Sequence, residues 1–252
     1  MVSTSLKTDP QVYRIPSPWI PNPARWRNYI EAMTIVPFGK FFLNTIKYAI
    51  LVTIGTVLSS TLVAYGFSRV QWKGRDAVFF LCLATMMIPG QVRMIPLYIV
   101  FSKIGWVNSY KPLIIPSFFA AAYDVFLLRQ FFLTIPLELS DAARIDGASE
   151  LTILGRVVIP LAKPAMAVVA LFTIMGAWDN YLGPLIYLTD REQYPIALGL
   201  QMLRTTTPSF YMELQWPRLM AASAVTIFPI ILLYFFTQRT FVEGISITGI
   251  KG

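Results

Sequence analysis

The run Asp141-Ala142-Ala143-Arg144-Ile145-Asp146-Gly147 is a polar island between strongly apolar segments, with two acids and an arginine among its members. Pro136 is placed to open a short helix, because proline is common in the first helical turn. Gly147 is placed to end that helix, since glycine adopts the left-handed backbone of helix ends at little cost. Ala142 and Ala143 give the helix a face with little side chain, which the backbone of a partner can approach closely.

A second helix is expected after the glycine. Apolar residues recur there at helical spacing and predict one buried stripe, formed by Leu151, Leu154, Val158 and Leu161. This helix is expected to end at Pro160, so that residues 136–163 form a helix-turn-helix loop. An amphipathic surface hairpin without a special role is the alternative interpretation of the loop.

The composition of the chain predicts a membrane protein. Apolar residues make up 56% of it, charged residues 13%, and the mean hydropathy is +0.59, whereas a soluble domain has about 25% charged residues. A helix crosses the hydrocarbon with roughly 20 apolar residues, because its backbone polar groups are satisfied internally. The predicted fold is therefore an all-α helix bundle in the membrane with five spanning helices. These are expected near residues 41–67, 77–100, 112–134, 164–188 and 219–242.

Several functional classes are excluded because the chain lacks certain residue types or does not group them into a site. The net charge of +8 comes from basic residues spread over the loops, so it does not indicate nucleic-acid binding. Without any histidine, Ser-His-Asp catalysis and most zinc sites are excluded. The pair Gly39-Lys40 lacks the glycine spacing and the hydroxyl of a phosphate-binding loop. We therefore expect no enzyme activity, no cofactor and no metal, and the single Cys82 forms no disulfide within the chain.

The loop at residues 136–163 resembles the EAA loop of ABC importer permeases, in which Glu-Ala-Ala, three residues, Gly and nine residues precede Ile-x-Leu-Pro. Asp141 stands at the position of the glutamate, and Gly147 falls on the glycine. The closing positions are occupied by Val157, Ile159 and Pro160.

The flanks of the loop, residues 126–132 and 161–164, are similar to the maltose-type carbohydrate branch of these permeases, and the similarity runs from about residue 41 to residue 252. The resemblance implies a second homologous permease, two cytoplasmic ABC ATPase subunits and an extracytoplasmic solute-binding protein as partners, with a sugar as substrate. It also implies that the ATPase is contacted by Asp141, Ala142, Ala143, Arg144, Asp146, Gly147 and Ala148.

The orientation in the cell membrane follows from the same resemblance. If the loop is cytoplasmic, so is the short connection at residues 68–76, which carries three cations, as the positive-inside rule favours. Residues 1–40 are then expected to be extracytoplasmic, and residues 41–252 form the transmembrane permease domain. Permeases of this kind usually have six membrane helices, whereas five are predicted here. Either a first helix is missing before residue 1, which is the favoured interpretation, or the chain functions without it.

Polar residues inside apolar stretches are candidates for the translocation pathway. A charge at the centre of a spanning helix costs roughly 2.5–3.5 kcal/mol and normally faces a bundle interior or an aqueous cavity. Aromatic rings beside polar groups suit a sugar, whose ring face stacks while its hydroxyls bond. Polar contacts between packed helices are the alternative. The candidates are Trp178, Asp179, Asn180, Tyr181, Asp124 and Gln91.

Two further features concern helix geometry. The run Met87-Ile88-Pro89-Gly90-Gln91 is expected to break its spanning helix, which is tolerated only against protein or water. Gly55, Ser59, Ser60 and Ala64 form a face of small residues that predicts close helix packing.

Alternatives of other classes stay open at this point. A proton- or ion-coupled carrier would use Asp124 and Asp179, although no internal repeat of the kind found in many such carriers is visible. A membrane scaffold without transport activity is a third hypothesis. Polyamine, phosphate and amino-acid importers also have EAA loops, but their flanking sequences fit this chain less well.

Overall fold

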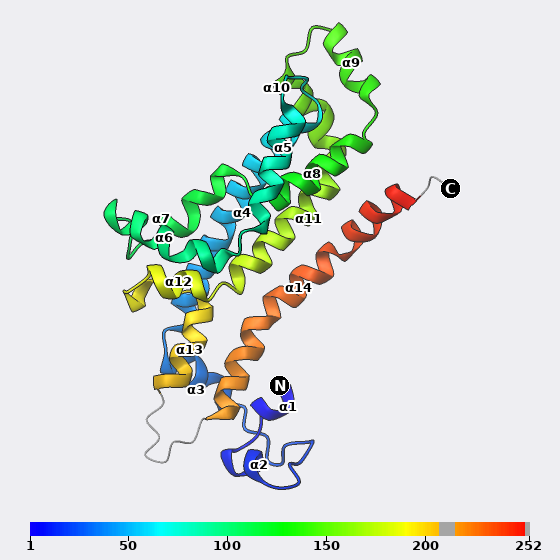
Figure 1. The fold of residues 1–252 in the computed structure, drawn as a ribbon. Helices are drawn as coiled ribbons and strands as arrows, with labels where there is room; N and C mark the ends of the chain where they lie inside the picture. Colours follow the sequence, from blue (N-terminus) through cyan, green and yellow to red (C-terminus); the bar gives the residue numbers. More distant parts are fainter. Residues whose placement is uncertain (207–214, 250–252) are drawn as a thin grey trace. The chain divides into compact units, whose positions relative to one another are not determined.

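The computed structural model describes residues 1–206 and 215–249, and every regular element in these ranges is helical (Figure 1). The predicted all-α fold is confirmed. The chain divides into two compact units, which we call unit 1 (Met1–Lys47 and Trp178–Phe236) and unit 2 (Tyr48–Ala177 and the chain from Thr237 on).

Unit 1 contains short helices and the first parts of two long ones. They are α1 (Val2–Ser5), α2 (Asp9–Tyr13), α3 (Arg27–Ile35), the start of α4 (Phe38–Ser68), α12 (Leu182–Tyr187), η4 (Arg191–Gln193), α13 (Ile196–Thr206) and the start of α14 (Trp216–Gly249).

Unit 2 contains the remainder of α4 and most of the other helices. They are α5 (Arg75–Ala84), η1 (Thr85–Met87), α6 (Gly90–Lys103), α7 (Lys111–Ile114), η2 (Ile115–Phe119), α8 (Ala122–Thr134), α9 (Leu137–Ile145), α10 (Glu150–Ile153), the π-helical turn η3 (Leu154–Val158) and α11 (Ile159–Trp178).

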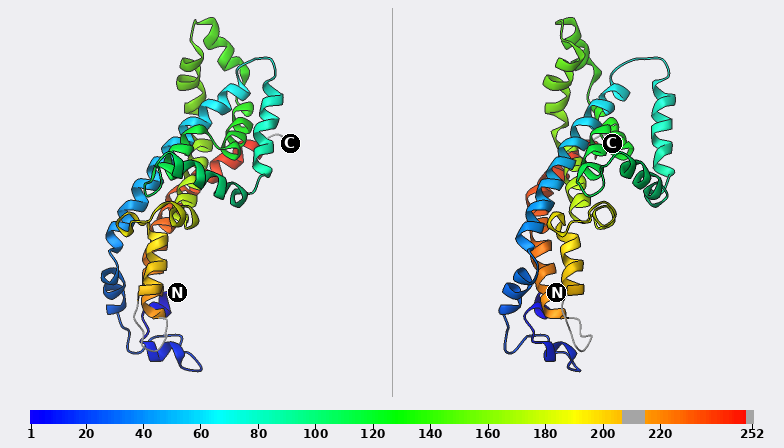
Figure 2. Two further views of the ribbon diagram at one scale, coloured as in Figure 1. Left: turned by 60° about the vertical axis from the view of Figure 1, so that its left-hand side comes forward. Right: turned by 90° about the vertical axis from the view of Figure 1, so that its left-hand side faces the viewer.

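The membrane-spanning segments of the described ranges number four, or five as predicted if a bent helix pair counts as one span. Within the described residues, four helical segments are long and apolar enough to cross a membrane, and a bent pair makes a fifth. The four are Phe38–Ser68, Lys111–Thr134, Glu150–Trp178 and Trp216–Gln238. The pair is Arg75–Met87 with Gly90–Lys103, bent by 95°, so the predicted break at Pro89 and Gly90 is confirmed. Figure 2 shows α6 turning away from α5 after this break.

One span was predicted in the wrong register. We expected it at residues 164–188, but it runs over Glu150–Trp178 and ends before Asp179. Hydropathy alone placed it too late because Leu182–Tyr187 is also apolar, yet this segment is the separate helix α12. Pro160 and Pro164 do not end α11, which starts at Ile159 and contains both.

Unit 1 is held together by a buried contact between α4 and α13. The Phe41 ring is fully buried and lies so close to Gly199 that a Cβ at that position would collide with it. Thr45 is also fully buried, and its Oγ1 accepts the Ile196 backbone N–H at 2.8 Å. Because that N–H belongs to the first turn of α13, the hydroxyl satisfies a donor that the helix leaves unpaired.

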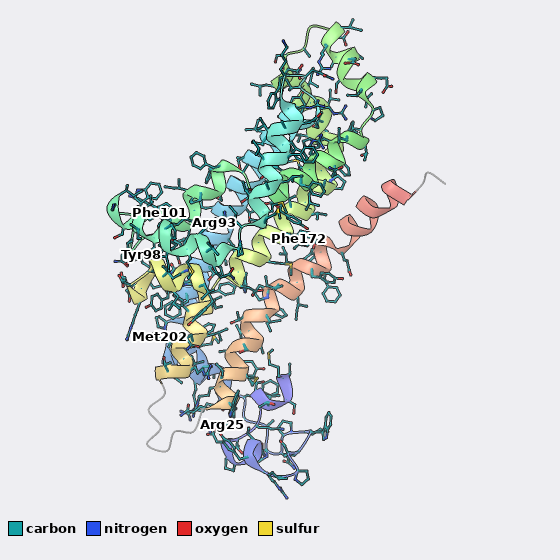
Figure 3. All side chains as sticks on the ribbon, in the orientation of Figure 1. Arg25, Arg93, Tyr98, Phe101, Phe172 and Met202 are labelled. Atoms are coloured by element: carbon teal, nitrogen blue, oxygen red, sulfur yellow. The ribbon has the colours of Figure 1, made fainter. Side chains whose placement is uncertain are left out.

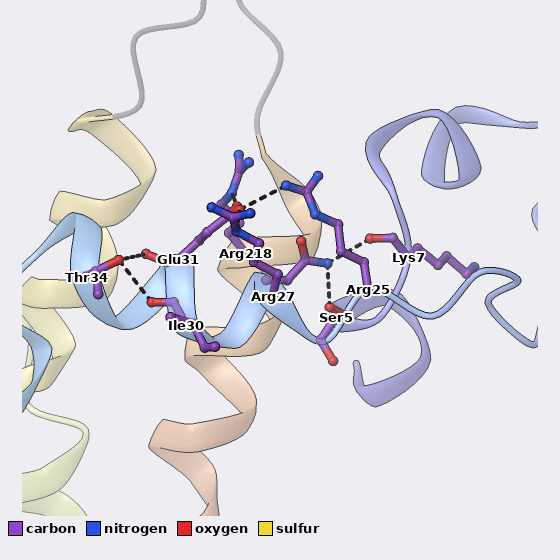
Figure 4. Close-up of polar contacts among 9 residues, drawn as sticks. Ser5, Lys7, Arg25, Arg27, Ile30, Glu31, Thr34 and Arg218 are labelled. Carbon is purple, nitrogen blue, oxygen red and sulfur yellow. Dashed lines mark hydrogen bonds and ion pairs between the residues drawn. The ribbon is translucent and has the colours of Figure 1, made fainter.

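The N-terminal segment is tied to α3 and α14 by polar side chains. Asn28 is buried and donates from Nδ2 to the carbonyl oxygens of Ser5 and Lys7, at 2.8 Å each. Glu31 accepts from Arg218 Nε at 2.6 Å and from Arg25 Nη2 at 2.9 Å (Figure 4).

Unit 2 confirms the predicted packing of the small-residue face of α4. A Cβ at Gly55 would collide with Ser117 and Phe118 of η2. Ser59 Oγ donates to the Ser117 carbonyl at 3.0 Å and accepts the Ala120 backbone N–H at 3.0 Å. The close approach therefore lets one hydroxyl satisfy backbone groups where the span Lys111–Thr134 is irregular.

Candidate functional site

The turn at Gly147 has the predicted geometry. The helix α9 runs over Leu137–Ile145 with Pro136 as its N-cap, and Gly147 follows with a φ of +79°. The Gly147 N–H donates to the Arg144 carbonyl at 3.0 Å, and the Ala148 N–H donates to the Ala143 carbonyl at 2.9 Å. These bonds satisfy carbonyls at the end of α9. Apart from the two adjacent residues of the chain, a Cβ on Gly147 would have no heavy atom within 4 Å, so the position requires glycine for its backbone alone.

The segment after the glycine differs from the prediction. Leu154 and Val158 are buried as expected, but Leu151 is 73% and Leu161 47% exposed, so the predicted apolar stripe is wrong. The helix also passes through Pro160 instead of ending there. The π-helical turn η3 lies between Ile153 and Ile159, and its wider winding rotates the buried face of the helix that follows it, at Leu161.

Arg144 fixes the two arms of the loop to each other. Its Nη1 donates to Asp141 Oδ1 at 2.7 Å, and its Nε donates to Glu150 Oε1 at 2.9 Å. A third bond joins Nη2 to Glu150 Oε2 at 3.3 Å. The hydrogen bonds with Glu150 and then with Asp141 raise the pKa of Arg144 from its ordinary value, against the opposing effect of partial burial. The loop is therefore pinned across its glycine turn.

Sequence reasoning missed Glu150 and Tyr65. Tyr65 lies near the end of α4, and its hydroxyl donates to Glu150 Oε2 at 2.5 Å. Glu150 could have been predicted from the sequence, because it is an acid placed six residues after Arg144 across a glycine turn. No local pattern connects Tyr65 with a residue so distant in the sequence.

The predicted coupling residues form an exposed tip. Asp141, Ala142, Asp146 and Gly147 are exposed, while Ala143, Arg144 and Ala148 are half-buried. The apolar side chains of Ile145, Leu137 and Leu139 on the same helix are 87%, 54% and 45% exposed. Figure 2 shows α9 projecting from the end of unit 2. Apolar side chains exposed together outside a spanning segment are typical of a surface that another protein covers.

The predicted residues at 178–181 lie together on the turn between α11 and α12. Trp178 is buried, donates from Nε1 to the Thr226 carbonyl at 3.2 Å, and meets the Phe42 ring edge-on with centroids 5.5 Å apart. Asp179 is exposed, and Tyr181 is half-buried. Asn180, the residue before the N-cap Tyr181, accepts the Gly183 N–H with its Oδ1 at 3.1 Å and so satisfies a donor in the first turn of α12.

The other two candidates lie in unit 2. Asp124 is buried in the first turn of α8. Gln91 is exposed at the second residue of α6, directly after the break in its span. The same helix carries Arg93, Tyr98 and Phe101 (Figure 3). In the ranges that the structure describes, no group of three or more His, Cys, Asp or Glu side chains could hold a metal ion.

Comparisons with known proteins identify the family. The family described as "Binding-protein-dependent transport system inner membrane component" matches residues 55–246. The arabinooligosaccharides transport system permease protein AraQ of Halalkalibacterium halodurans is 35% identical over 215 residues, which cover 85% of this chain and 75% of that protein. The sn-glycerol-3-phosphate transport system permease protein UgpE of Yersinia pestis bv. Antiqua (strain Antiqua) is 32% identical over 243 residues, covering 94% and 85%.

A solved structure has the same fold. It is described as a bacterial ABC transporter involved in the import of the acidic polysaccharide alginate, and one of its chains matches with a TM-score of 0.82. The match covers 94% of this chain and 87% of that chain at 24% identity. The chain therefore belongs to the family of binding-protein-dependent transport system inner membrane components, the permease subunits of ABC importers, and is a multi-pass protein of the cell membrane.

Proposed function

We propose that this chain is the permease subunit of an ATP-driven importer for a sugar or oligosaccharide. The observation that carries the proposal is the 35% identity, over 85% of the chain, with a permease named for arabinooligosaccharides. The chain forms the translocation pathway together with a second, homologous permease. An extracytoplasmic solute-binding protein delivers the solute, and two cytoplasmic ATPase subunits drive the transport cycle.

In this proposal, α9 and the turn at Gly147 dock on the ATPase. Support comes from the exposed tip, where small and apolar side chains such as Ala142 and Ile145 are available to a partner. The bonds of Arg144 to Asp141 and Glu150 keep the tip in one shape. Closure of the ATPase pair then moves a rigid element, and this movement rocks the spanning helices between inward-open and outward-open states.

The proposed pathway residues have different roles. Asp179 is an exposed carboxylate beside Tyr181, a pairing that suits a ring face and its hydroxyls. Asn180 already accepts a backbone bond that starts α12, so it orients this turn. Trp178 anchors the turn to α14 through its hydrogen bond with the Thr226 carbonyl. Contact of Asp124 and Gln91 with the solute stays a prediction.

A phosphorylated polyol is a second candidate substrate. One observation favours it besides the likeness to a permease named for sn-glycerol 3-phosphate. Arg93 is exposed on α6, and it is the single charged residue of the sequence between Asp76 and Lys103. A cation in such an apolar segment normally faces a partner or an aqueous path. An anionic group on the solute would give it a partner.

Uptake by cells that express the complete importer tests both candidates. The chain is produced with a candidate partner permease, ATPase and solute-binding protein, and uptake of labelled arabinooligosaccharide is compared with uptake of labelled glycerol 3-phosphate. Sugar uptake that disappears with a hydrolysis-deficient ATPase subunit and survives an uncoupler is the expected result. Uptake that an uncoupler abolishes, and that continues without the ATPase, would instead indicate an ion-coupled carrier and overturn the proposal.

A further inference from the structure

At the cytoplasmic ends of α4 and α8, an arginine from each helix end donates hydrogen bonds to backbone carbonyls at the end of the other helix. Arg69, directly after α4, donates from Nη2 to the carbonyls of Phe132 and Ile135 at the end of α8, and from Nη1 to the Pro136 carbonyl at 3.5 Å. Arg129 of α8 donates in return from Nε to the Phe67 carbonyl at the end of α4, at 3.1 Å. We call these two reciprocal contacts the arginine clamp.

The physical reason for the clamp lies in the ends of helices. The last carbonyls of a helix have no intrahelical partner, and the aligned peptide dipoles make that end favourable for a cation. A guanidinium satisfies several carbonyls at once because its donors form a fixed, planar fork. Both α4 and α8 end at this edge of unit 2, so each can supply the cation that the other needs.

Arg69 is an unusual member because it is buried. It is 3% exposed, and no carboxylate pairs with it among the described residues. Burial lowers the pKa of its guanidinium from the ordinary value, but the group remains protonated at physiological pH. A buried charge held by carbonyls alone is costly to displace, because any movement away leaves both the charge and the carbonyls unsatisfied.

The same turn of α4 also holds the α9–α10 loop. The Arg69 carbonyl accepts from Arg144 Nη2 at 3.5 Å, and Tyr65 is bonded to Glu150. Pro136, whose carbonyl Arg69 contacts, is the N-cap of α9. Arg129 adds α5 to the assembly, because it lies 4.1 Å from the centre of the Phe79 ring and 3.6 Å from Asp76 Oδ1.

We propose that Arg69 is a positioning residue for energy coupling: with Arg129 it makes α4, α8 and the start of α9 move as one piece, so that movement of the loop reaches the spanning helices. The inference rests on the proposed docking of this loop on the ATPase. Arg69 contacts neither solute nor nucleotide in this scheme. Its loss therefore leaves ATP hydrolysis possible but separates hydrolysis from transport.

The test measures ATP hydrolysed per solute imported by the complete importer in proteoliposomes. Arg69→Gln removes the charge and most donors, and we expect this ratio to rise severalfold while the subunits still assemble. Arg69→Lys keeps the charge but lacks the planar fork, so an intermediate ratio is expected. Lys73→Gln is the matched control, since it removes one cation from the same connection at an exposed position and should leave the ratio unchanged.

Arg129→Gln provides an independent measurement at the other half of the clamp, and a smaller increase in the ratio is expected. Should Arg69→Gln fail to assemble, Arg69→Lys and Arg129→Gln decide the question. A wild-type ratio in every assembled clamp variant would overturn the inference. Failure of the proposed function looks different, because then the ATPase would not co-purify even with the wild-type chain.

Discussion

Gly147 is a residue whose role can be isolated, because its surroundings are empty while its backbone is constrained. The φ of +79° is costly for any residue with a Cβ, and most costly for a β-branched one. Apart from the two adjacent residues of the chain, no heavy atom lies within 4 Å of the position that a Cβ would take. A substitution there changes the turn without creating a clash.

Gly147→Val is therefore expected to weaken ATPase binding and solute uptake together, while membrane insertion and association with the second permease persist. The strain is on the order of 1 kcal/mol or more, enough to tilt α9 away from its docked position. Co-purification of the ATPase, measured beside uptake, gives the answer. Gly155→Val is the matched control, since Gly155 is exposed, helical and free of close neighbours, with no positive φ. Full ATPase recovery and normal uptake in Gly147→Val would contradict the coupling role.

Asn180 requires a different design, because its side chain satisfies a donor in the first turn of α12. Loss of such a bond costs about 1 kcal/mol, so reduced uptake in Asn180→Ala alone could reflect an unravelled helix. Asn180→Ser keeps an acceptor for this donor and removes the amide. We expect reduced uptake in both Asn180 variants and in Asp179→Ala, with normal subunit assembly. Normal uptake in Asp179→Ala and Asn180→Ser, with a loss only in Asn180→Ala, would assign the residue to local structure.

At the scale of helices, the sequence predicts what depends on local composition and misses what depends on distant neighbours. The span Phe38–Ser68, its small-residue face and the break before α6 were all predicted, because apolar length, small side chains and a Pro-Gly pair are local signals. The π-helical turn η3 was not predicted, and it shifted the buried face of the helix after it, at Leu161. A π-turn depends on packing of the whole span and leaves no pattern in hydropathy.

The proposed coupling site shows the same division. Pro136, Gly147 and the exposed alanine were predicted from local helix signals, and the glycine's positive φ is confirmed. The contacts that hold the loop were not predicted. Tyr65 and Arg69 contact residues more than sixty positions away, and only the tertiary fold brings them together.

The tie between α3 and α14 gives a prediction about pH at the same scale. Burial raises the pKa of Glu31, but the hydrogen bond and charge of Arg218, with Arg25, outweigh it and lower the pKa overall. A carboxyl with a lowered folded-state pKa adds stability above its unfolded pKa of about 4.3, and this stability is lost as the pH falls through the folded value.

Glu31→Gln should therefore lower the melting temperature of the detergent-solubilised protein at neutral pH. A contribution of about 1 kcal/mol corresponds to roughly 2–4 °C for a chain of this size. The difference from wild type should shrink as the pH falls below about 4. Glu138→Gln serves as control, because Glu138 is exposed on α9 and forms no ion pair among the described residues. A difference that does not change with pH would refute the ionic origin of the effect.

For the whole molecule, orientation in the membrane is the property on which the coupling role depends. An odd number of spans places the two ends of the chain on opposite sides, and five spans follow from counting the bent pair α5–α6 as one. If that pair were re-entrant, only four spans would remain and both ends would lie on one side. The loop at residues 136–163 and residues 1–40 lie on opposite sides of the membrane only in the five-span arrangement.

Cysteine labelling in intact cells distinguishes these arrangements. Cys82 is first replaced by alanine, which is a small change at a half-buried position, so that a single introduced thiol is read each time. A cysteine at Ser17, exposed in the N-terminal segment, should react with a membrane-impermeant maleimide. A cysteine at Glu138, exposed on α9, should react only after the membrane is permeabilised. Labelling of both positions in intact cells would mean that α5–α6 does not cross the membrane. Labelling of the Glu138 position alone would mean that the whole orientation is reversed, with residues 1–40 inside the cell. In both cases α9 would lie outside the cell, where a cytoplasmic ATPase cannot reach it.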